Sequence, residues 1–495
     1  MTSFRLGSLA PKEPWLASAP PTNSAYQLRR AFEAGWGGAV WKTIDFEPIV
    51  NVSSRYGAVD YDGRKIMGFN NIELISDRTL EDNLDEIREL KREFPDRALV
   101  VSLMVESNRE SWHEMVKRVE DTGCDGLELN FGCPHGMSER GMGSAVGQVP
   151  EYTEMITSWV KEVARTPVLV KLTPNVTDVR VIGRAAQAGG ADGLSLINTV
   201  NSIVGVDLDS FNPVPHVAGR GSHGGYCGPA VKPIAMHMVH ALASDPEITI
   251  PISGIGGIQA WQDAVEFMLL GASGVQVCTA VMHYGFRLID HFVSGLELWM
   301  MDKGFGRIDD FVGKTVEKVG GWGELDLAYK VVAEISQERC IHCGLCYIAC
   351  EDGAHQSIVR TPVADEDFVP SVASGAGSFE SSGSRRFMAG AGGGYVNVYE
   401  IDQDSCVGCN LCSLLCPVDG CISMVARDSG LPPMTWNEYQ ERLERGRFVW
   451  PAAKDGKVSL SPSMLAMLLE GIDWRMPQKT WRPLTTGDLE ENPAP

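Results

Sequence analysis

Two runs of four cysteines in the second half of the chain restrict its fold more than any other feature. Each has the spacing C-x2-C-x2-C-x3-C, and the eight residues are Cys340, Cys343, Cys346, Cys350, Cys406, Cys409, Cys412 and Cys416. In two-cluster ferredoxins with this spacing, three thiolates of a run hold one [4Fe–4S] cube and the fourth holds the other. Structural zinc is the alternative, but zinc sites usually pair their cysteines two by two. The runs therefore predict a ferredoxin-like domain with two [4Fe–4S] clusters, although Glu351 stands where the bacterial pattern has proline.

Short apolar runs alternate with amphipathic stretches through the part of the chain before the cysteines. Eight candidate strands are Trp15–Ala19, Ala39–Thr43, Leu99–Val105, Gly126–Asn130, Val168–Leu172, Gly193–Ile197, Ile250–Gly254 and Gly274–Cys278. Several follow a glycine that is able to cap the preceding helix. Eight such units predict an α/β fold, a (β/α)8 TIM barrel with its active site at the carboxyl ends of the strands. A doubly wound open sheet is the alternative.

Reactive side chains follow these strands, where a barrel has its active site. After the fourth strand, Asn130, Cys133 and His135 lie in a glycine-rich loop. A surface loop with a buried cysteine is the alternative for this loop. The other groups placed in this way are Lys42, Thr43, Lys171, Asn198, Thr199, Cys278 and Thr279. Glycines of Ser253–Ile258, after the seventh strand, predict a phosphate cradle, because N–H groups at a helix start favour an anion.

Three amides, those of Asn71, Asn130 and Asn198, are expected to converge on one cavity. Asn71 lies in a segment that we expect to cross the barrel mouth. Each amide offers a donor and an acceptor, so a ring with alternating N–H and C=O groups is their complement. Lys42 and Lys171 add positive charge, which suits a cofactor that becomes anionic when reduced. For any one of these residues a turn amide or a solvated charge is the alternative, and their joint placement favours a binding site.

Charge and composition exclude several classes of partner. The 495 residues carry a formal charge of −21, which argues against nucleic acid and against an anionic membrane surface. No apolar segment approaches the length of about 18 residues that a membrane span needs. Cysteines gathered in two runs indicate metal in a reducing compartment, so we expect a cytoplasmic protein. No G-x-G-x-x-G run opens a helix after a strand, so electrons must come from outside the chain.

The same patterns place the domain boundaries. We expect the barrel at 1–310, a linker at 311–335, the two-cluster domain at 336–430 and a C-terminal extension at 431–495. A Gly/Ser-rich insertion at 361–395 is too poor in apolar residues to fold alone. The extension carries Trp436, Trp450, Trp474 and Trp481. These tryptophans either dock on a neighbour or pack back onto this chain.

The motifs together resemble the dihydropyrimidine dehydrogenase family. They are Asn71-Ile-Glu-Leu-Ile-Ser, Asn130-Phe-Gly-Cys-Pro-His-Gly-Met, Lys171-Leu-Thr-Pro-Asn, Asn198-Thr-Val and Gly254-Ile-Gly-Gly. The chain is similar to the catalytic subunit of the bacterial NAD-dependent enzyme and to the C-terminal half of the animal enzyme. The resemblance implies reduction of the 5,6 double bond of uracil or thymine, with FMN in the barrel. It also implies that electrons pass from NAD(P)H through a separate flavoprotein subunit and the two clusters.

The resemblance further implies roles for individual residues. Cys133 is the general acid that protonates ring carbon 5 while flavin N5 gives hydride to carbon 6. The residues that hold the pyrimidine are Asn71, Asn130, Asn198 and Thr199. The contacts of FMN are Ala19, Lys42, Thr43, Lys171, Gly228, Gly256, Gly257, Cys278 and Thr279. Gly132 stands where the animal enzyme has serine, so a hydroxyl contact is expected to be missing.

Two other interpretations stay open. A dihydroorotate dehydrogenase or another FMN-dependent ene-reductase shares Asn-x-x-Cys-Pro, but orotate carries a carboxylate and needs a cation beside the ring. Arg140 is the candidate cation in the motif loops. In the second interpretation the barrel is only structural and the chain is an electron-transfer module.

Overall fold

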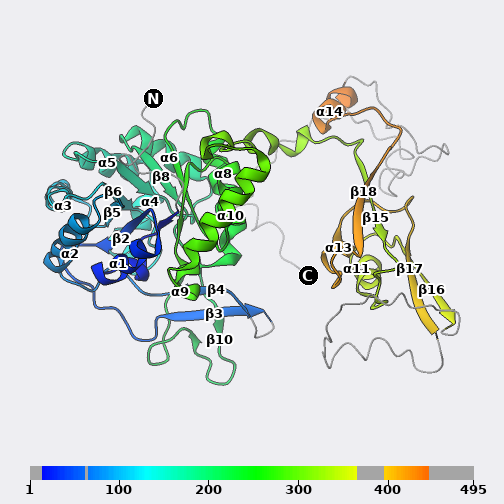
Figure 1. Cartoon of the computed structure of the whole chain (residues 1–495), viewed down its shortest axis with the longest axis horizontal. Helices are drawn as coiled ribbons and strands as arrows, with labels where there is room; N and C mark the ends of the chain where they lie inside the picture. The colour runs from blue at the N-terminus through cyan, green and yellow to red at the C-terminus, as the bar shows by residue number, and fades with distance from the viewer. Residues whose placement is uncertain (1–13, 62–64, 365–394, 445–495) are drawn as a thin grey trace, which may run out of the picture. The chain divides into compact units, whose positions relative to one another are not determined.

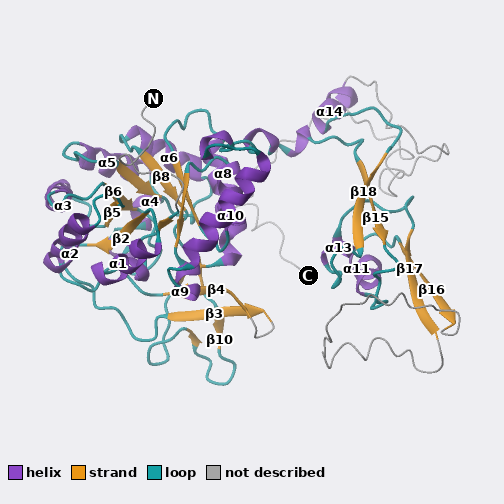
Figure 2. Ribbon diagram, in the orientation of Figure 1, coloured by secondary structure: helices purple, strands orange, loops and turns teal. Residues whose placement is uncertain are grey.

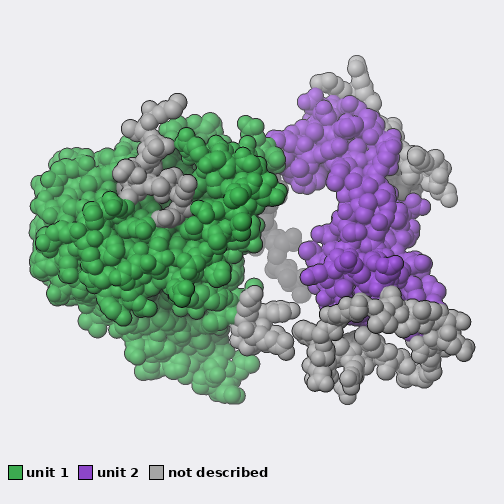
Figure 3. Space-filling model, viewed as in Figure 1, with its two compact units in different colours: residues 1–319 green, residues 320–495 purple. Residues whose placement is uncertain are grey.

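The computed structural model describes residues 14–61, 65–364 and 395–444. The chain forms two compact units, Met1–Val319 and Gly320–Pro495 (Figure 3). Within the described ranges, no helix combines the length and the apolar character that crossing a bilayer requires.

A closed barrel of eight parallel strands forms the centre of the first unit (Figure 1). The strands are β1 Trp15–Leu16, β2 Gly38–Ile44, β5 Ala98–Leu103, β6 Gly126–Asn130, β7 Val168–Lys171, β8 Gly193–Leu196, β13 Ile252–Ile255 and β14 Gly274–Val277. They pair in the order β1-β14-β13-β8-β7-β6-β5-β2, and β1 also pairs with β2. Because this pairing closes the ring, the predicted TIM barrel is confirmed and the open-sheet alternative is wrong.

Helices surround the strands (Figure 2). They are α1 Ala25–Ala34, α2 Leu80–Glu93, α3 Arg109–Glu120, α4 Ser144–Gly147, α5 Pro150–Lys161, α6 Val179–Ala188, α7 Lys232–Ala243, α8 Trp261–Leu269, α9 Thr279–Tyr284 and α10 Leu288–Lys303. Short 3-10 turns are η1 Pro20–Thr22, η2 Ser138–Arg140, η3 Pro229–Val231, η4 Ile308–Asp310 and η5 Val316–Lys318. Local sequence fixes helix ends: the side chain of Asn108 accepts from Ser111 N at the start of α3, and α1 ends at Gly35 with φ +113°.

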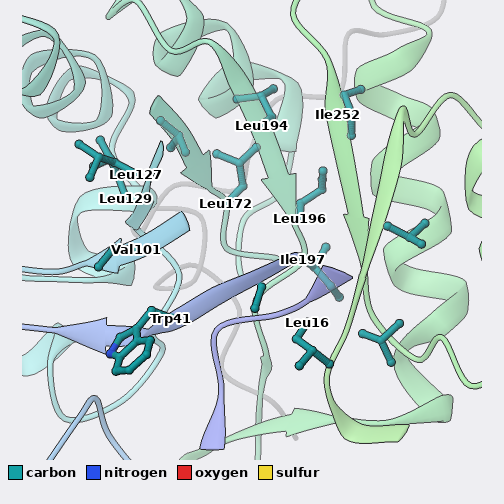
Figure 4. Close-up of a cluster of buried hydrophobic side chains, with 14 of the residues drawn as sticks. Leu16, Trp41, Val101, Leu127, Leu129, Leu172, Leu194, Leu196, Ile197 and Ile252 are labelled. Carbon is teal, nitrogen blue, oxygen red and sulfur yellow. The ribbon is translucent and has the colours of Figure 1, made fainter. Parts of the chain in front are cut away.

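Alternation along the strands separates an apolar outer layer from the barrel interior, where Val40, Val100 and Leu169 form a second apolar cluster. On β6, Leu127 and Leu129 belong to the main cluster of buried apolar side chains (Figure 4). Glu128 and Asn130 occupy the alternate positions and face the barrel interior, because successive side chains of a strand point to opposite faces. Both are buried. The apolar layer therefore holds the strand in place while its polar residues are directed toward the barrel axis.

A small antiparallel sheet is formed by segments that interrupt the barrel repeat. Its strands are β3 Tyr56–Tyr61, β4 Lys65–Asn71, β9 Val200–Ser202 and β12 Gly224–Cys227, in the order β3-β4-β12-β9. A two-stranded ribbon pairs β10 Gly205–Val206 with β11 Pro213–Val214. In the sheet, Asn71 pairs with Tyr56 on one side and with Gly225 on the other. This pairing brings residues from before the third barrel strand beside residues from after the sixth.

The second unit has the α+β ferredoxin-like architecture that the cysteine runs predict. Its elements are η6 Trp322–Glu324, β15 Lys330–Ile335, α11 Leu345–Gly353, β16 Ile358–Ala364, β17 Tyr395–Ile401, α13 Leu411–Leu414, β18 Ile422–Arg427 and α14 Trp436–Glu444. β15 pairs antiparallel with β18, and β16 pairs antiparallel with β17. Its buried cluster contains Cys346, Cys350 and Cys412 together with Ile358 and Tyr399.

Residues at both ends of the predicted linker, 311–335, belong to the folded units. Phe311 is fully buried in the barrel core, with its ring 5.0 Å from that of Trp299. Lys330–Ile335 forms β15, which pairs with β18 along its whole length. The two units divide between Val319 and Gly320, which lie within the predicted linker.

The insertion and the C-terminal extension are described in part. Residues 361–364 and 395 belong to β16 and β17, and the rest of the predicted insertion lies outside the described residues. In the extension, the ring of Trp436 lies 5.3 Å from that of Trp322, so this tryptophan packs within its own chain. Trp450, Trp474 and Trp481 lie outside the described residues.

Candidate active site

A cavity of about 1140 Å³, counted with its open mouth, lies where the carboxyl ends of the barrel strands meet the small antiparallel sheet. Every site residue expected in the barrel lines it: Ala19, Lys42, Thr43, Asn71, Asn130, Cys133, Lys171, Asn198, Thr199, Gly228, Gly256, Gly257, Cys278 and Thr279. The segment around Asn71 therefore lies at the barrel mouth, as expected. The closed barrel brings together side chains that are more than 200 residues apart in the sequence.

Hydrogen bonds orient the amides of the cavity. Asn130 Nδ2 donates to Thr43 Oγ1 at 2.9 Å, and Asn198 Nδ2 donates to Asn130 Oδ1 at 3.0 Å. Asn198 Oδ1 accepts from the backbone N–H of Thr199 at 2.8 Å. Asn71 Oδ1 accepts from the backbone N–H of Glu73 at 2.7 Å. Because partners on four different segments hold these amides, a ligand meets a preorganised set of donors and acceptors.

Gly132 allows Asn198 to approach the loop after β6. A Cβ atom at position 132 would lie 2.4 Å from Asn198 Cβ, closer than any real contact. The side chain of Asn198 therefore occupies the space that a serine at this position needs. A serine at position 132 would therefore displace the side chain of Asn198, a predicted pyrimidine contact.

Cys133 lies in an apolar pocket at the end of β6. Its side chain packs with Ile75, Met104, Met137 and Met142, and only 8% of the residue is exposed. Its S–H donates to the backbone oxygen of His135 at 3.5 Å. Burial raises the pKa of the Cys133 thiol to about 11. The sulfur therefore keeps its proton at neutral pH and is able to act as an acid.

His135 lies beside Cys133 without adding a positive charge. Its Nε2 donates to the backbone oxygen of Glu73 at 3.3 Å. Burial lowers the pKa of His135, so the ring is neutral at pH 7. Nδ1 is buried and has no hydrogen-bond partner among the described residues. The ring joins the loop after β6 to the segment after β4.

A buried carboxylate that the sequence analysis did not assign, Glu73, lies at the cavity wall. It forms an ion pair with Lys42, accepts a hydrogen bond from the hydroxyl of Tyr56, and lies 3.4 Å from Arg55 Nη1. Burial by itself would raise the pKa of Glu73, but Lys42, Tyr56 and Arg55 hold it below its usual range. The motif Asn71-Ile-Glu-Leu-Ile contained the signal, because Glu73 is the charged residue within an otherwise neutral segment.

Glycines form one wall of the cavity. Gly228, Gly256 and Gly257 have φ values of +99°, +132° and +73°, which L side chains rarely adopt. A Cβ atom at Gly257 would also lie 2.8 Å from Lys232 Cβ and 2.9 Å from Gly228 O. The backbone is therefore bare here, as the predicted phosphate cradle requires.

Two further cavities in the second unit are lined by cysteines. One, of about 310 Å³, is lined by Cys340, Cys343, Cys346 and Cys416 of the two runs and also by Cys421. The other, of about 360 Å³, is lined by Cys350, Cys406, Cys409 and Cys412. Each cavity thus combines three cysteines of one run with the fourth of the other. This is the crossed arrangement that the spacing predicts for two cubes.

Comparison with known families supports the same division of the chain. The family described as Dihydroorotate dehydrogenase matches residues 54–300, and the family described as 4Fe-4S dicluster domain matches residues 339–420. The family described as IS66 Orf2 like protein matches residues 437–479, most of which lie outside the described residues.

Individual relatives identify the family. The NAD-dependent dihydropyrimidine dehydrogenase subunit PreA of Escherichia coli K12 is 41% identical over 356 residues, which cover 70% of this chain and 86% of that protein. The chain belongs to the dihydropyrimidine dehydrogenase family. The chloroplastic dihydropyrimidine dehydrogenase (NADP(+)) of Arabidopsis thaliana is 40% identical over 61% of this chain and 74% of its own length. The catalytic subunit of dihydroorotate dehydrogenase B of Pyrococcus abyssi is 37% identical, over 61% and 94% respectively.

Family membership accounts for both halves of the chain. The barrel match is shared with dihydroorotate dehydrogenases, whereas the match to the dicluster domain lies beyond it in the sequence. The relative from E. coli is named as a subunit of an NAD-dependent dihydropyrimidine dehydrogenase.

Proposed function

We propose that this chain reduces the 5,6 double bond of uracil or thymine to the dihydropyrimidine in the cytoplasm. Electrons from NAD(P)H enter through a separate flavoprotein subunit and pass over two [4Fe–4S] clusters to FMN in the barrel. The family assignment supports this reaction, and the barrel cavity that joins the amides, the thiol and the bare glycine wall supports its location.

The charges around the cavity favour a neutral pyrimidine over orotate as the substrate. Among the described residues that line it, the lysines are Lys42 and Lys171, and each faces a buried carboxylate, Glu73 or Glu128. Arg140 is exposed and does not line the cavity. Such a site favours a neutral ring that exchanges hydrogen bonds with Asn71, Asn130, Asn198 and Thr199. The carboxylate of orotate would enter a cavity in which both lining lysines already face a buried carboxylate.

The cavity also fits FMN. Gln276 Oε1 is buried and has no partner in the described part of the chain, so it offers an acceptor to a ring N–H. The bare backbone at Gly228, Gly256 and Gly257 offers N–H groups to a phosphate. The proposed contacts are Ala19, Lys42, Thr43, Lys171, Gly228, Gly256, Gly257, Cys278 and Thr279, all of which line the cavity.

The roles of the residues in the reaction follow from this placement. FMN, when bound, supplies the hydride for ring carbon 6. The amides hold the ring in place, and Cys133 gives the proton to carbon 5 because its raised pKa keeps it protonated. The methionines around the thiol give it apolar surroundings. In the second unit, the eight cysteines of the two runs hold the clusters.

Anaerobic titration of the holoenzyme tests the function. Dihydrouracil is expected to bleach the oxidised flavin absorbance near stoichiometrically, since the reverse reaction delivers hydride to FMN. Dihydroorotate should leave the absorbance unchanged. Bleaching by dihydroorotate alone would instead establish the dihydroorotate dehydrogenase activity that the Pyrococcus relative suggests. No bleaching by either compound would favour an electron-transfer module.

Crossed cluster ligation is tested with two pairs of variants. Cys416→Ser should damage the same cube as Cys343→Ser, and Cys350→Ser the same cube as Cys409→Ser, because each pair lines one cavity. Iron content and electron paramagnetic resonance of the reduced protein distinguish the two cubes. The assignment is wrong if Cys416→Ser gives the spectrum of Cys409→Ser.

A further inference from the structure

Below the proposed FMN site lies a carboxylate that the mechanism above does not use, Glu128 of β6. It is fully buried, with an exposed fraction of 0%. Glu128 Oε1 accepts from Ser195 Oγ at 2.8 Å and from Gln276 Nε2 at 3.3 Å. Gln276 Nε2 also donates to Ser253 Oγ at 3.2 Å. One carboxylate thus joins side chains of β8, β13 and β14 inside the barrel.

The second carboxylate oxygen of Glu128 faces the ammonium group of Lys171. Glu128 Oε2 lies 3.5 Å from Lys171 Nζ and makes no hydrogen bond within the described residues. Both side chains are buried. A buried charge is costly unless a counter-charge lies close to it, so the pair is held together by the need of each ion for the other. Lys171 lines the cavity, whereas Glu128 lies behind it on the neighbouring strand β6.

We propose that Glu128 is a positioning residue that sets the position and the effective charge of Lys171 toward FMN. The proposal rests on FMN occupying this cavity. A cation beside a flavin stabilises its anionic reduced form and raises the reduction potential, and a carboxylate behind that cation opposes the effect. Glu128 therefore keeps the flavin potential lower than Lys171 alone would set it. A lower potential favours transfer of the hydride onward to the pyrimidine ring.

The direction in which the flavin potential changes distinguishes a charge effect of Glu128 from a packing effect. Glu128→Gln keeps the side-chain shape but removes the negative charge, so the flavin potential should rise. We expect the ratio of reduced to oxidised FMN at a fixed potential to increase at least tenfold, which is about 30 mV for a two-electron couple. Lys171→Gln should shift the ratio in the opposite direction. The double variant should lie between the two single variants, because the residues act as a pair.

Reductive titration of the holoenzyme against a reference dye measures the ratio, with the flavin followed by its absorbance. Ser195→Ala is the matched control: it removes a hydrogen bond to Glu128 without changing a charge, and should shift the ratio less than twofold. An unchanged or lowered potential in Glu128→Gln, with FMN still bound, would overturn the proposal. If that variant does not fold, Lys171→Gln decides, and a potential that does not fall would overturn it.

This readout is independent of pyrimidine turnover. A potential that rises in Glu128→Gln while dihydrouracil fails to bleach the wild-type flavin would refute the proposed function and leave the role of Glu128 standing. Bleaching with no shift of potential would refute the role of Glu128 and leave the function standing.

Discussion

Replacing Cys133 with alanine is expected to lower the rate of uracil reduction by about 10² to 10⁴-fold, the usual contribution of a positioned acid. The side chains of Ile75, Met104, Met137 and Met142, which surround the thiol, carry no acidic proton that could replace the missing one. The amides, the glycine wall and the cysteine cavities do not depend on this thiol. The flavin spectrum and the iron content should therefore equal those of the wild type, and steady-state kinetics with an artificial donor measures the loss.

Cys124→Ala provides the matched control, because Cys124 is equally buried but lies in the apolar core and does not line the cavity. It should keep most of the activity. A Cys133→Ala variant that retained more than about a tenth of the wild-type rate would contradict the acid role.

The wild-type rate should also stay level from neutral pH to about pH 10, because burial raises the pKa of Cys133 to about 11 and the acid form persists below that value.

The isolated chain is expected to reduce uracil with an artificial one-electron donor and to be inert with NADH or NADPH. A flavoprotein partner that oxidises the nicotinamide should restore the full rate. The relative from E. coli is named as a subunit of an NAD-dependent enzyme. The run Gly219–Gly224 has the spacing G-x-G-x-x-G, but it precedes β12 and does not open a helix after a strand. It therefore lacks the setting in which a dinucleotide binds.

Anaerobic stopped-flow absorbance measures this dependence directly, since flavin and cluster bands both bleach on reduction. Dithionite serves as the control that both centres accept electrons. Rapid reduction of the isolated chain by NAD(P)H would contradict the prediction and indicate a nicotinamide site in this chain.

The sequence predicted the barrel well because its strands are buried on both faces and read as short apolar runs. One error has a clear physical cause: the expected strand Ile250–Gly254 is shifted to Ile252–Ile255. Pro251 has no N–H to donate to a neighbouring strand, so pairing begins after it. The first strand also ends at Leu16, whereas the expected strand continued to Ala19.

The small antiparallel sheet could not be predicted in the same way. Two of its strands, β9 and β12, are only three and four residues long, which is too short to show an alternation of apolar and polar side chains. For the same reason the sequence did not predict which residues lie beside Asn71, nor the contacts of Glu73 and Tyr56. Motif spacing located the reactive groups, but the pairing of each cation with a carboxylate depends on contacts between distant strands.

The hairpin of β16 and β17 has a practical consequence for bioelectrochemistry. Its seven residue pairs run without a break from Ile358 opposite Ile401 to Ala364 opposite Tyr395. Ala364 and Tyr395, which border residues 365–394 of the predicted insertion, are therefore side by side, and the cost of closing a loop between them grows only slowly with its length. A peptide that binds an electrode, grafted between Ala364 and Tyr395, would leave this pairing intact. The hairpin is thus a position at which the cluster domain can be attached to an electrode surface.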